Sequence, residues 1–447
     1  MSGDRPFPVD ELRREFPALA AADPFIFFDN AAGAQVPQRA VAAVADHLVA
    51  RNVQRGGPYG RSREVDATIA RARSSIADLV NARSPDEIAF GLNATSFIRA
   101  ISLAVGQTLT DRSEIVISDL DHEANVATWL ALARAGARIV WWRVRSDGRL
   151  HLEDLEPLLT RSTRLVACTI ASNATGTKVD VAGAGARAHA AGAELFLDAV
   201  HYAPHGPVDV QALECDYLVC SGYKIFGPHM GFAWCRPAAI DHLPTFREDF
   251  IPDRMPDKLE AGTYAYENVA GMEGAIEYLA DLGRRTGGAP MPQRDAIRSA
   301  MEAIVRYEAT LCTAMFDALA EVPGASIHGI SDRAQLDRRV PTIAFSIDGV
   351  SAATVAERLD ARGIGVRSGH MYAPRLMDRL GVPGVVRASL VHYNTLAEVE
   401  RFRNALAEIA AEVRPTPPAS GLRSAAPESG EGAGRSTSAS PAESPST

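Results

Sequence analysis

The sequence predicts an α/β fold in which helices cover both faces of a mostly parallel sheet. From residue 88 onward, short apolar runs alternate with stretches of helical spacing, which is typical of repeated strand–helix–strand units. The runs contain few polar residues, as expected of strands buried on both faces. Parallel strands joined by right-handed crossovers end along one edge of the sheet, so residues that follow the strands meet there.

The elements follow from this pattern in chain order. Apolar runs predict strands at residues 88–90, 114–117, 139–142, 165–170, 195–197 and 217–220. The spacing of Ala, Val, Leu and Ile predicts helices at 10–16, 40–53, 65–80, 97–105, 152–159 and 182–191, and one that ends at 135. Further along, we expect helices at 269–282, 294–319, 352–362 and 396–413 and strands at 342–347, 364–367 and 386–390.

These elements divide the chain into four parts. Residues 1–24 form an N-terminal arm or helix, and residues 25–285 form the large α/β domain. Residues 286–413 form a smaller α+β domain, against which the N-terminal segment can pack. The last part, 414–447, consists mainly of Pro, Ser, Gly, Ala and Glu, and too few apolar side chains remain there to order it. We therefore expect a disordered tail.

Composition excludes several classes of protein. A net charge of -9 argues against nucleic acid as the main partner, since nucleic-acid binding usually requires a basic face. No apolar run approaches the ~20 residues that span a bilayer, so we expect no membrane partner. The acidic N-terminal stretch does not resemble a signal peptide, and we expect a cytoplasmic protein. The five cysteines have neither disulfide nor metal-ligand spacing, which predicts reduced core residues and no metal site.

Polar residues follow five of the six strands predicted between residues 88 and 220. In chain order these residues are Thr95, His122, Asn173, Asp198 and Lys224. A carboxylate and a lysine at neighbouring strand ends suit pyridoxal phosphate, which needs an amine for a Schiff base and an acid to keep its ring nitrogen protonated. From the pair alone, a helix-capping aspartate and a solvated lysine remain an alternative.

The segment Gly91–Ser96 leads from a strand into a helix. Its small and hydroxyl-bearing residues are typical of a phosphate site, because the free N–H groups and the dipole of a helix N-terminus favour an anion. A plain helix cap explains the same residues. The segment by itself leaves both interpretations open.

Longer motifs resemble one family. They read DNAAGAQVPQ from residue 29, DHEAN from 121, SNATGTK from 172, DAVHYAPH from 198, DYLVCSGYKIFGPHMG from 216, EAGT from 260 and VVRASLVHYNT from 385. Their order and content are similar to those of class V aminotransferases, in the branch with cysteine desulfurases and selenocysteine lyases. The resemblance covers about residues 20–413.

The resemblance implies a fold-type I pyridoxal phosphate enzyme with a seven-stranded type of sheet, a homodimer with sites at the subunit interface, and an amino-acid substrate. Lys224 would be the Schiff-base lysine and then the base at Cα. Asp198 would hold the ring nitrogen protonated, and His122 would stack on the ring as the second catalytic residue. Asn173 would bind the ring hydroxyl oxygen, and His201 stands where many relatives have glutamine.

The remaining roles implied by the resemblance concern anionic groups. Arg387 would grip the substrate α-carboxylate. The phosphate would be held by Thr95, Ser221, the Ala94 N–H and Tyr223, which stands where relatives have histidine, and Thr263 would reach the phosphate of the neighbouring subunit.

One loop departs from the family pattern. Desulfurases of this branch carry a nucleophilic cysteine in a motif resembling Arg-x-Gly-His-His-Cys, whereas residues 367–372 here read RSGHMY. A thioether cannot attack sulfur as a thiolate does, so we expect no persulfide-forming desulfuration. His370, Tyr372 and His201 are candidate acids for a leaving group or lining residues of the substrate pocket, and plain packing residues otherwise.

The cofactor's remaining chemistry favours β-elimination from a cysteine-type substrate, which is C–S lyase activity. An aminotransferase or amino-acid epimerase would use the same lysine, aspartate and arginine, and fold alone does not separate these reactions. Decarboxylation, oxidation with oxygen and a non-catalytic cofactor-binding protein also stay open.

Overall fold

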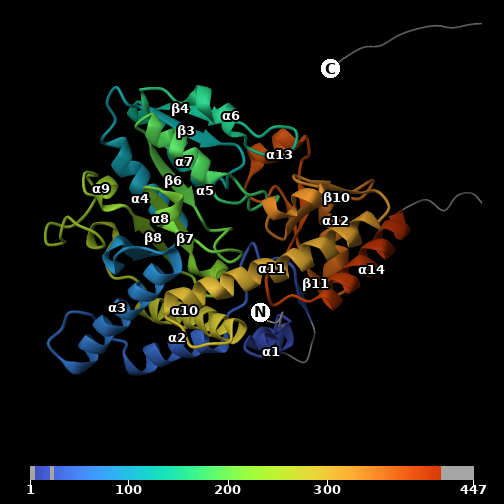
Figure 1. Ribbon diagram of the computed structural model, residues 1–447, viewed down its shortest axis with the longest axis horizontal. Helices are drawn as coiled ribbons and strands as arrows, with labels where there is room; N and C mark the ends of the chain where they lie inside the picture. Colours follow the sequence, from blue (N-terminus) through green and yellow to red (C-terminus); the bar gives the residue numbers. More distant parts are fainter. Residues whose placement is uncertain (1–5, 21–24, 414–447) are drawn as a thin grey trace, which may run out of the picture. The chain divides into compact units, whose positions relative to one another are not determined.

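A seven-stranded sheet forms the centre of the larger part of the chain. The computed structural model describes residues 6–20 and 25–413, and Figure 1 shows them coloured along the sequence. The strand order is β2-β8-β7-β6-β5-β3-β4, and β8 runs antiparallel to both of its neighbours while the other pairs are parallel. The strands are β2 (Ile88–Gly91), β3 (Glu114–Ser118), β4 (Arg138–Trp142), β5 (Thr163–Thr169), β6 (Glu194–Asp198), β7 (Tyr217–Ser221) and β8 (Gly231–Cys235). The predicted mostly parallel sheet is confirmed.

Both faces of this sheet are buried, which explains its continuous apolar runs. Within β6, Leu195 and Leu197 pack into one core cluster, whereas Phe196 packs into the cluster on the opposite face. Successive side chains of a strand point to opposite faces of the sheet. When helices cover both faces, the strand therefore needs apolar residues at every position. The helices up to residue 240 are α1 (Val9–Arg13), α2 (Gln38–Ala50), α3 (Gly60–Val80), α4 (Ala94–Gly106), α5 (Ala124–Leu130), α6 (Leu152–Leu155), α7 (Val181–Ala190), α8 (Val210–Leu213) and α9 (Pro237–Ile240).

The C-terminal part contains a second sheet. Its order is β12-β13-β10-β9, and every pair is antiparallel. A separate short pair joins β1 and β11 in parallel. The strands are β1 (Ile26–Phe27), β9 (Ala325–His328), β10 (Thr342–Ile347), β11 (Ile364–Gly365), β12 (Arg367–Gly369) and β13 (Val385–Ser389), and the helices are α12 (Ala352–Asp360), α13 (Pro374–Leu380) and α14 (Leu396–Val413).

Two long helices connect these parts. The helices α10 (Tyr266–Gly287) and α11 (Gln293–Ala320) lie side by side in Figure 1. The first half of α11 contributes Ile297 and Ile304 to the core beside the large sheet. Its second half contributes Leu311 and Met315 to the core of the C-terminal part. One rigid helix therefore belongs to both cores, and the expected boundary at residue 285 stays a prediction.

Short 3₁₀ turns complete the described chain. They are η1 (Pro17–Leu19), η2 (Pro85–Glu87), η3 (Ala131–Ala135), η4 (Glu156–Leu158), η5 (Gly222–Lys224), η6 (Asp257–Leu259) and η7 (Arg333–Arg338). The ends of the helices predicted to stop at 135 and 159 are such turns, and η6 lies in a link expected to be irregular.

Some predictions of local structure were wrong. The strand expected at 364–367 is two strands that break at Val366, because the first pairs with β1 and the second pairs with β13. No strand was predicted at β1, β8 or β9, and no helix was predicted at α8, α9 or α13. The tail predicted for 414–447 lies outside the described residues, as do residues 1–5 and 21–24 of the expected arm.

Candidate active site

Two adjoining cavities lie beyond the carboxyl ends of β5, β6 and β7. The inner one is narrow, about 50 Å³, and the outer one measures about 310 Å³. The outer volume is near the lower end of the roughly 300–1,000 Å³ typical of small-molecule sites. The inner cavity is lined by Ala94, Thr95, Ile98, His122, Ala124, Thr169, Asn173, Asp198, Val200, His201, Ser221, Tyr223 and Lys224. The outer one is lined by Ala31, Ala32, His122, Asn173, Tyr223, Lys224, Arg367, Tyr372 and Arg387.

Lys224 and Asp198 supply the amine and the carboxylate of the inner cavity. Asp198 ends β6, and its Oδ1 accepts a hydrogen bond from the Val200 N–H at 2.8 Å. Lys224 lies in the 3₁₀ turn that follows β7. Burial, and then the charge of Arg387, lower the pKa of Lys224 to about 8, while Asp198 acts in the opposite direction. The amine is therefore partly unprotonated near neutral pH, as a nucleophile requires.

The N-terminus of α4 forms the wall beside Ser221. Asn93 caps the helix by accepting a hydrogen bond from the Ser96 N–H at 2.9 Å. The backbone N–H of Ala94, the first residue of α4, donates a hydrogen bond to the Ser221 hydroxyl at 3.2 Å. The start of α4 can lie this close to β8 only because residue 231 is glycine. A Cβ at Gly231 would lie 2.5 Å from the carbonyl carbon of Asn93. The residues predicted to bind the phosphate thus lie together near a helix N-terminus, and such a terminus favours an anion.

His122 is neutral in this site. Its Nδ1 accepts a hydrogen bond from the Ala124 N–H at 3.0 Å, so the proton of the neutral ring is on Nε2. Burial, together with the charges of Lys224 and Arg387, lowers the pKa of His122 to about 4. The ring centroid of Tyr372 lies 5.6 Å from that of His122. A neutral ring of this kind is suited to packing on another aromatic ring.

The loop of residues 367–372 is held at the site by hydrogen bonds of its backbone. The Met371 carbonyl accepts a hydrogen bond from Asn173 Nδ2 at 2.6 Å, and the Tyr372 carbonyl accepts one from the Glu123 N–H at 2.7 Å. Both Met371 and Tyr372 have positive φ angles, near 55°, which side chains disfavour. The contacts therefore hold a strained turn, and they place the Tyr372 ring at the outer cavity.

Two polar atoms of the residues that line the inner cavity are buried and have no partner among the described residues. They are Asn173 Oδ1 and His201 Nε2. Buried polar atoms normally form hydrogen bonds, so each is free for a ligand atom. With the helix terminus for an anion, the acid Asp198 and the amine Lys224, this donor and acceptor set fits pyridoxal phosphate.

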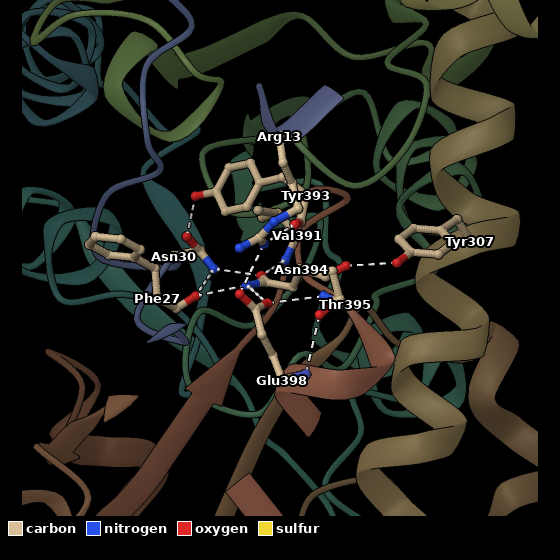
Figure 2. A network of polar contacts seen from close by, with 9 residues as sticks. All are labelled: Arg13, Phe27, Asn30, Tyr307, Val391, Tyr393, Asn394, Thr395 and Glu398. Carbon is tan, nitrogen blue, oxygen red and sulfur yellow. Dashed lines mark hydrogen bonds and ion pairs between the residues drawn. The ribbon is translucent and has the colours of Figure 1, made fainter. Parts of the chain in front are cut away.

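Arg387 is buried between the site and the N-terminal segment. Its Nη1 donates to the Asn173 carbonyl and its Nη2 donates to Asp29 Oδ1, each at 2.8 Å. Figure 2 shows how the neighbouring Asn30 is anchored: its side-chain amide donates to the Phe27 carbonyl at 2.7 Å and to Asn394 Oδ1 at 3.0 Å. This network fixes the segment 27–31, and with it Asp29, against the C-terminal sheet.

Two predicted residues lie apart from both cavities. Thr263 is exposed, and its hydroxyl accepts a hydrogen bond from Gln54 Nε2 at 3.0 Å. His370 is exposed and lines neither cavity, although its Nδ1 accepts a hydrogen bond from the Tyr372 N–H at 3.1 Å. Their proposed roles stay predictions.

The cysteines do not form the cavity walls, although Cys168 and Cys220 directly precede the lining residues Thr169 and Ser221. All five are free and buried, and none lines either cavity. Burial raises the pKa of the Cys168 and Cys220 thiols, so neither is a ready thiolate. In the described part of the chain, no group of three His, Cys, Asp or Glu residues is placed to hold a metal ion. No helix between residues 6 and 413 is long and apolar enough to cross a membrane.

Several residues that line or adjoin the outer cavity were not predicted. Arg367 and Asp29 stood in motifs that were quoted without a role for either residue. Asp29 contacts both arginines, and its neighbours Ala31 and Ala32 line the outer cavity. The only signal was their place inside the resembling motifs, since the contacts join residues more than 300 positions apart.

Comparisons with known proteins agree on one family. The model of the family described as "Aminotransferase class-V" matches residues 26–289 and 295–402. "Aminotransferase-like protein FGM3" of Gibberella zeae is 34% identical over 415 residues, which cover 90% of this chain and 98% of that protein. A cysteine desulfurase of Enterobacter sp. is 33% identical over 424 residues, which cover 90% and 98%.

Solved structures show the same fold. The cysteine desulfurase CsdA of Escherichia coli has a TM-score of 0.78 and 29% identity, covering 91% of this chain and 99% of that one. The cysteine desulfurase of Thermococcus onnurineus NA1 has a TM-score of 0.81 and 27% identity, covering 92% and 100%. The family model spans most of the chain, and the chain therefore belongs to the class V aminotransferase family of pyridoxal phosphate-dependent enzymes.

Proposed function

We propose that the inner cavity holds pyridoxal 5'-phosphate and that the outer cavity admits an amino acid. Asn173 Oδ1 and His201 Nε2 support this, since both are buried and free for ligand atoms. Ala94, Thr95, Ser221 and the nearby Tyr223 would hold the phosphate. The bound group supplies an electron sink for the carbanion left when an amino acid loses its Cα proton.

The chain's own residues divide the remaining work. Asp198, buried at the end of β6, would keep a proton on the ring nitrogen. Lys224, with a pKa of about 8, would hold the cofactor and then take the Cα proton as an amine. Arg387 would bind the α-carboxylate, because its guanidinium has five N–H donors and only two of them are bonded by protein groups. His122 would cover the ring as a neutral imidazole.

The reaction we propose is β-elimination from a cysteine-type amino acid. The observation that carries it is the lack of a thiol: residues 367–372 contain no cysteine, and none of the five cysteines lines a cavity. Without an acceptor thiol, the C–S bond breaks and the sulfur leaves as a thiolate, or as a sulfenate from a sulfoxide, and takes up one proton. Water then hydrolyses the three-carbon remainder to pyruvate and ammonia. Tyr372, at the cavity, is the candidate donor of that proton.

The test is product analysis with S-alkylcysteines and cysteine sulfoxides, without any 2-oxo acid. We expect pyruvate, ammonia and the sulfur leaving group in equal amounts from at least one of these substrates. Lys224→Ala should lose this activity together with the yellow colour of the bound cofactor. A yellow wild-type protein that forms no pyruvate from any of them would contradict the elimination, and a colourless wild type supplied with cofactor would contradict the cofactor site.

Amino transfer is the second candidate, supported by the similarity to an aminotransferase-like protein. It would use the same lysine, aspartate and arginine, so the residues do not decide between the two. A transferase requires a 2-oxo acid to turn over repeatedly, whereas the lyase does not. Turnover that depends on an added 2-oxo acid would therefore favour the transferase.

We also propose a homodimer in a reducing, cytoplasmic compartment. The segment before Thr263 carries Phe246 and Phe250, whose side chains are 90% and 82% exposed. Exposed large apolar side chains of this kind often mark a protein–protein interface. Free buried cysteines are typical of a reducing compartment. Light scattering after gel filtration should give twice the chain mass, and a Thr263→Ala variant should retain the cofactor less tightly.

A further inference from the structure

One residue of the large α/β part, Glu123, contacts the loop beside the outer cavity twice. Its backbone N–H donates a hydrogen bond to the Tyr372 carbonyl at 2.7 Å. Its carboxylate forms an ion pair, through Oε2, with Nη1 of Arg375 at the start of α13. Glu123 therefore holds the chain on both sides of residues 373 and 374, once by its backbone and once by its side chain.

The turn of residues 370–373 needs support from outside because its central residues are strained. Met371 and Tyr372 have φ angles of 54° and 55°, in the left-handed region that side chains disfavour. The cost for each residue is comparable to the net gain from one hydrogen bond. The two hydrogen bonds that reach these residues' carbonyls from Asn173 and Glu123 return about that much, so a further contact matters for the stability of the turn.

The position of the Arg375 guanidinium is set by its contacts. A cation in the first turn of a helix opposes the helix dipole, so this charge does not stabilise α13 by itself. The Cζ atom of Arg375 lies 5.4 Å from the ring centroid of Trp141. Contact with an aromatic face restricts the orientation of a guanidinium, which here is directed to the carboxylate of Glu123.

The helix α13 provides a fixed support for Arg375. Leu376 and Met377 are buried in the core beside the large sheet. At the other end of the helix, Arg379 Nη2 donates to the Val144 carbonyl at 2.7 Å. The ion pair therefore connects an anchored helix to Glu123, which directly follows His122 in the chain.

The effect of this ion pair should be local. The side chains of Arg375 and Glu123 are 33% and 35% exposed, and pairs of this kind contribute little to the stability of a whole protein. Their contact nevertheless closes the short stretch of chain that carries Tyr372, whose ring lines the outer cavity. A displacement of that ring by about 1 Å is enough to impair a reaction that depends on its position.

We propose that Arg375 is a positioning residue, which acts through Glu123 to keep the Tyr372 hydroxyl where it can give its proton to the leaving sulfur. The inference rests on the proposed function, in which Tyr372 is the proton donor. The C–S bond breaks with its electron pair on sulfur, and the proton moves from the phenol oxygen to that sulfur. The phenolate then regains a proton from water.

The test compares pyruvate formation by the holoenzyme from S-ethylcysteine and from S-(4-nitrophenyl)cysteine. An alkyl thiolate is a strong base and needs a proton to leave, whereas a nitrothiophenolate is a weak base and leaves without one. Arg375→Gln should lower kcat for S-ethylcysteine at least about tenfold with KM unchanged within about twofold, and it should leave kcat for the nitrophenyl substrate within about twofold. Glu123→Gln should give the same selective loss, and the double variant no further loss, because the two residues act as one unit.

Hydrogen exchange of the holoenzyme, followed by mass spectrometry, reports the turn without any substrate. The Ala373 N–H donates to the His370 carbonyl at 2.8 Å, so its exchange is slow only while the turn is formed. In Arg375→Gln, exchange in a peptide that covers residues 371–376 should be at least about tenfold faster. The control Arg145→Gln, which breaks a bidentate surface pair with Asp154, should change neither exchange nor kcat.

Two outcomes would overturn the proposal: equal losses of kcat for the two substrates, or exchange in Arg375→Gln at the wild-type rate. Failure of the proposed function would look different. A wild-type holoenzyme that forms pyruvate from neither substrate, or a Tyr372→Phe variant without the selective loss, would contradict the proposed reaction or its proton donor. In both cases the exchange measurement would still decide whether Arg375 holds the turn.

Discussion

The lowered pKa of Lys224 predicts how fast the protein without cofactor captures pyridoxal phosphate. Only the free amine attacks an aldehyde. With a pKa of about 8, roughly 9% of Lys224 is free amine at pH 7, against about 0.03% for a lysine with the ordinary pKa of 10.5, a difference of roughly 300-fold. The capture rate should therefore rise about tenfold per pH unit below pH 7 and level off above pH 8.

The assay follows visible absorbance after mixing the cofactor-free protein with pyridoxal phosphate between pH 6 and 10. The causes of the shift predict opposite effects of two substitutions. Arg387→Gln removes a charge that disfavours the protonated amine and should move the midpoint to higher pH. Asp198→Asn removes a charge that favours it and should move the midpoint to lower pH. A wild-type midpoint near 10, or shifts of the same sign in both variants, would refute this reasoning.

Three further predictions concern stability and the thiols. His205 Nδ1 and Glu308 Oε2 form a buried pair at 2.8 Å, so Glu308→Ala should lower the free energy of unfolding in urea by about 3–5 kcal/mol, and a loss below about 1 kcal/mol would contradict it. Gly231→Ala should lower the free energy of unfolding by about 1–3 kcal/mol and weaken cofactor retention in dialysis, because the new Cβ would displace the turn at Asn93. An unfolding midpoint equal to that of the wild type would contradict this prediction. Cys220→Ala should leave turnover unchanged, and lost turnover in a folded variant would indicate a role for this thiol.

The main sheet was predictable because its signal is local. Continuous apolar runs such as that of β6 follow from burial on both faces. The residues at or shortly after the ends of these strands, Asp198 and His122 among them, were expected to meet and do line one cavity. By contrast, β8 begins three residues after Pro228 and pairs antiparallel with β7. A pattern of alternating strands and helices does not predict such a strand.

The ion pair between Asp29 and Arg387, an arginine of the outer cavity, was not predictable from spacing. Asp29 and Arg387 are 358 positions apart, and their contact exists only because the N-terminal segment lies against β13. His370 is exposed, and the two residues after it, Met371 and Tyr372, have positive φ angles that their sequence does not predict. Such turns are set by tertiary contacts, here those of Asn173 and Glu123 with the loop backbone.

The reaction with cysteine itself tests the absence of an acceptor thiol most directly. Desulfuration through a persulfide leaves alanine, whereas β-elimination leaves pyruvate, ammonia and sulfide. The measurement quantifies alanine and pyruvate by mass spectrometry after incubation of the yellow protein with cysteine and a reductant. We predict pyruvate without alanine. Alanine as the main product, with a persulfide trapped on one of the five cysteines and lost when that cysteine is replaced, would contradict the account.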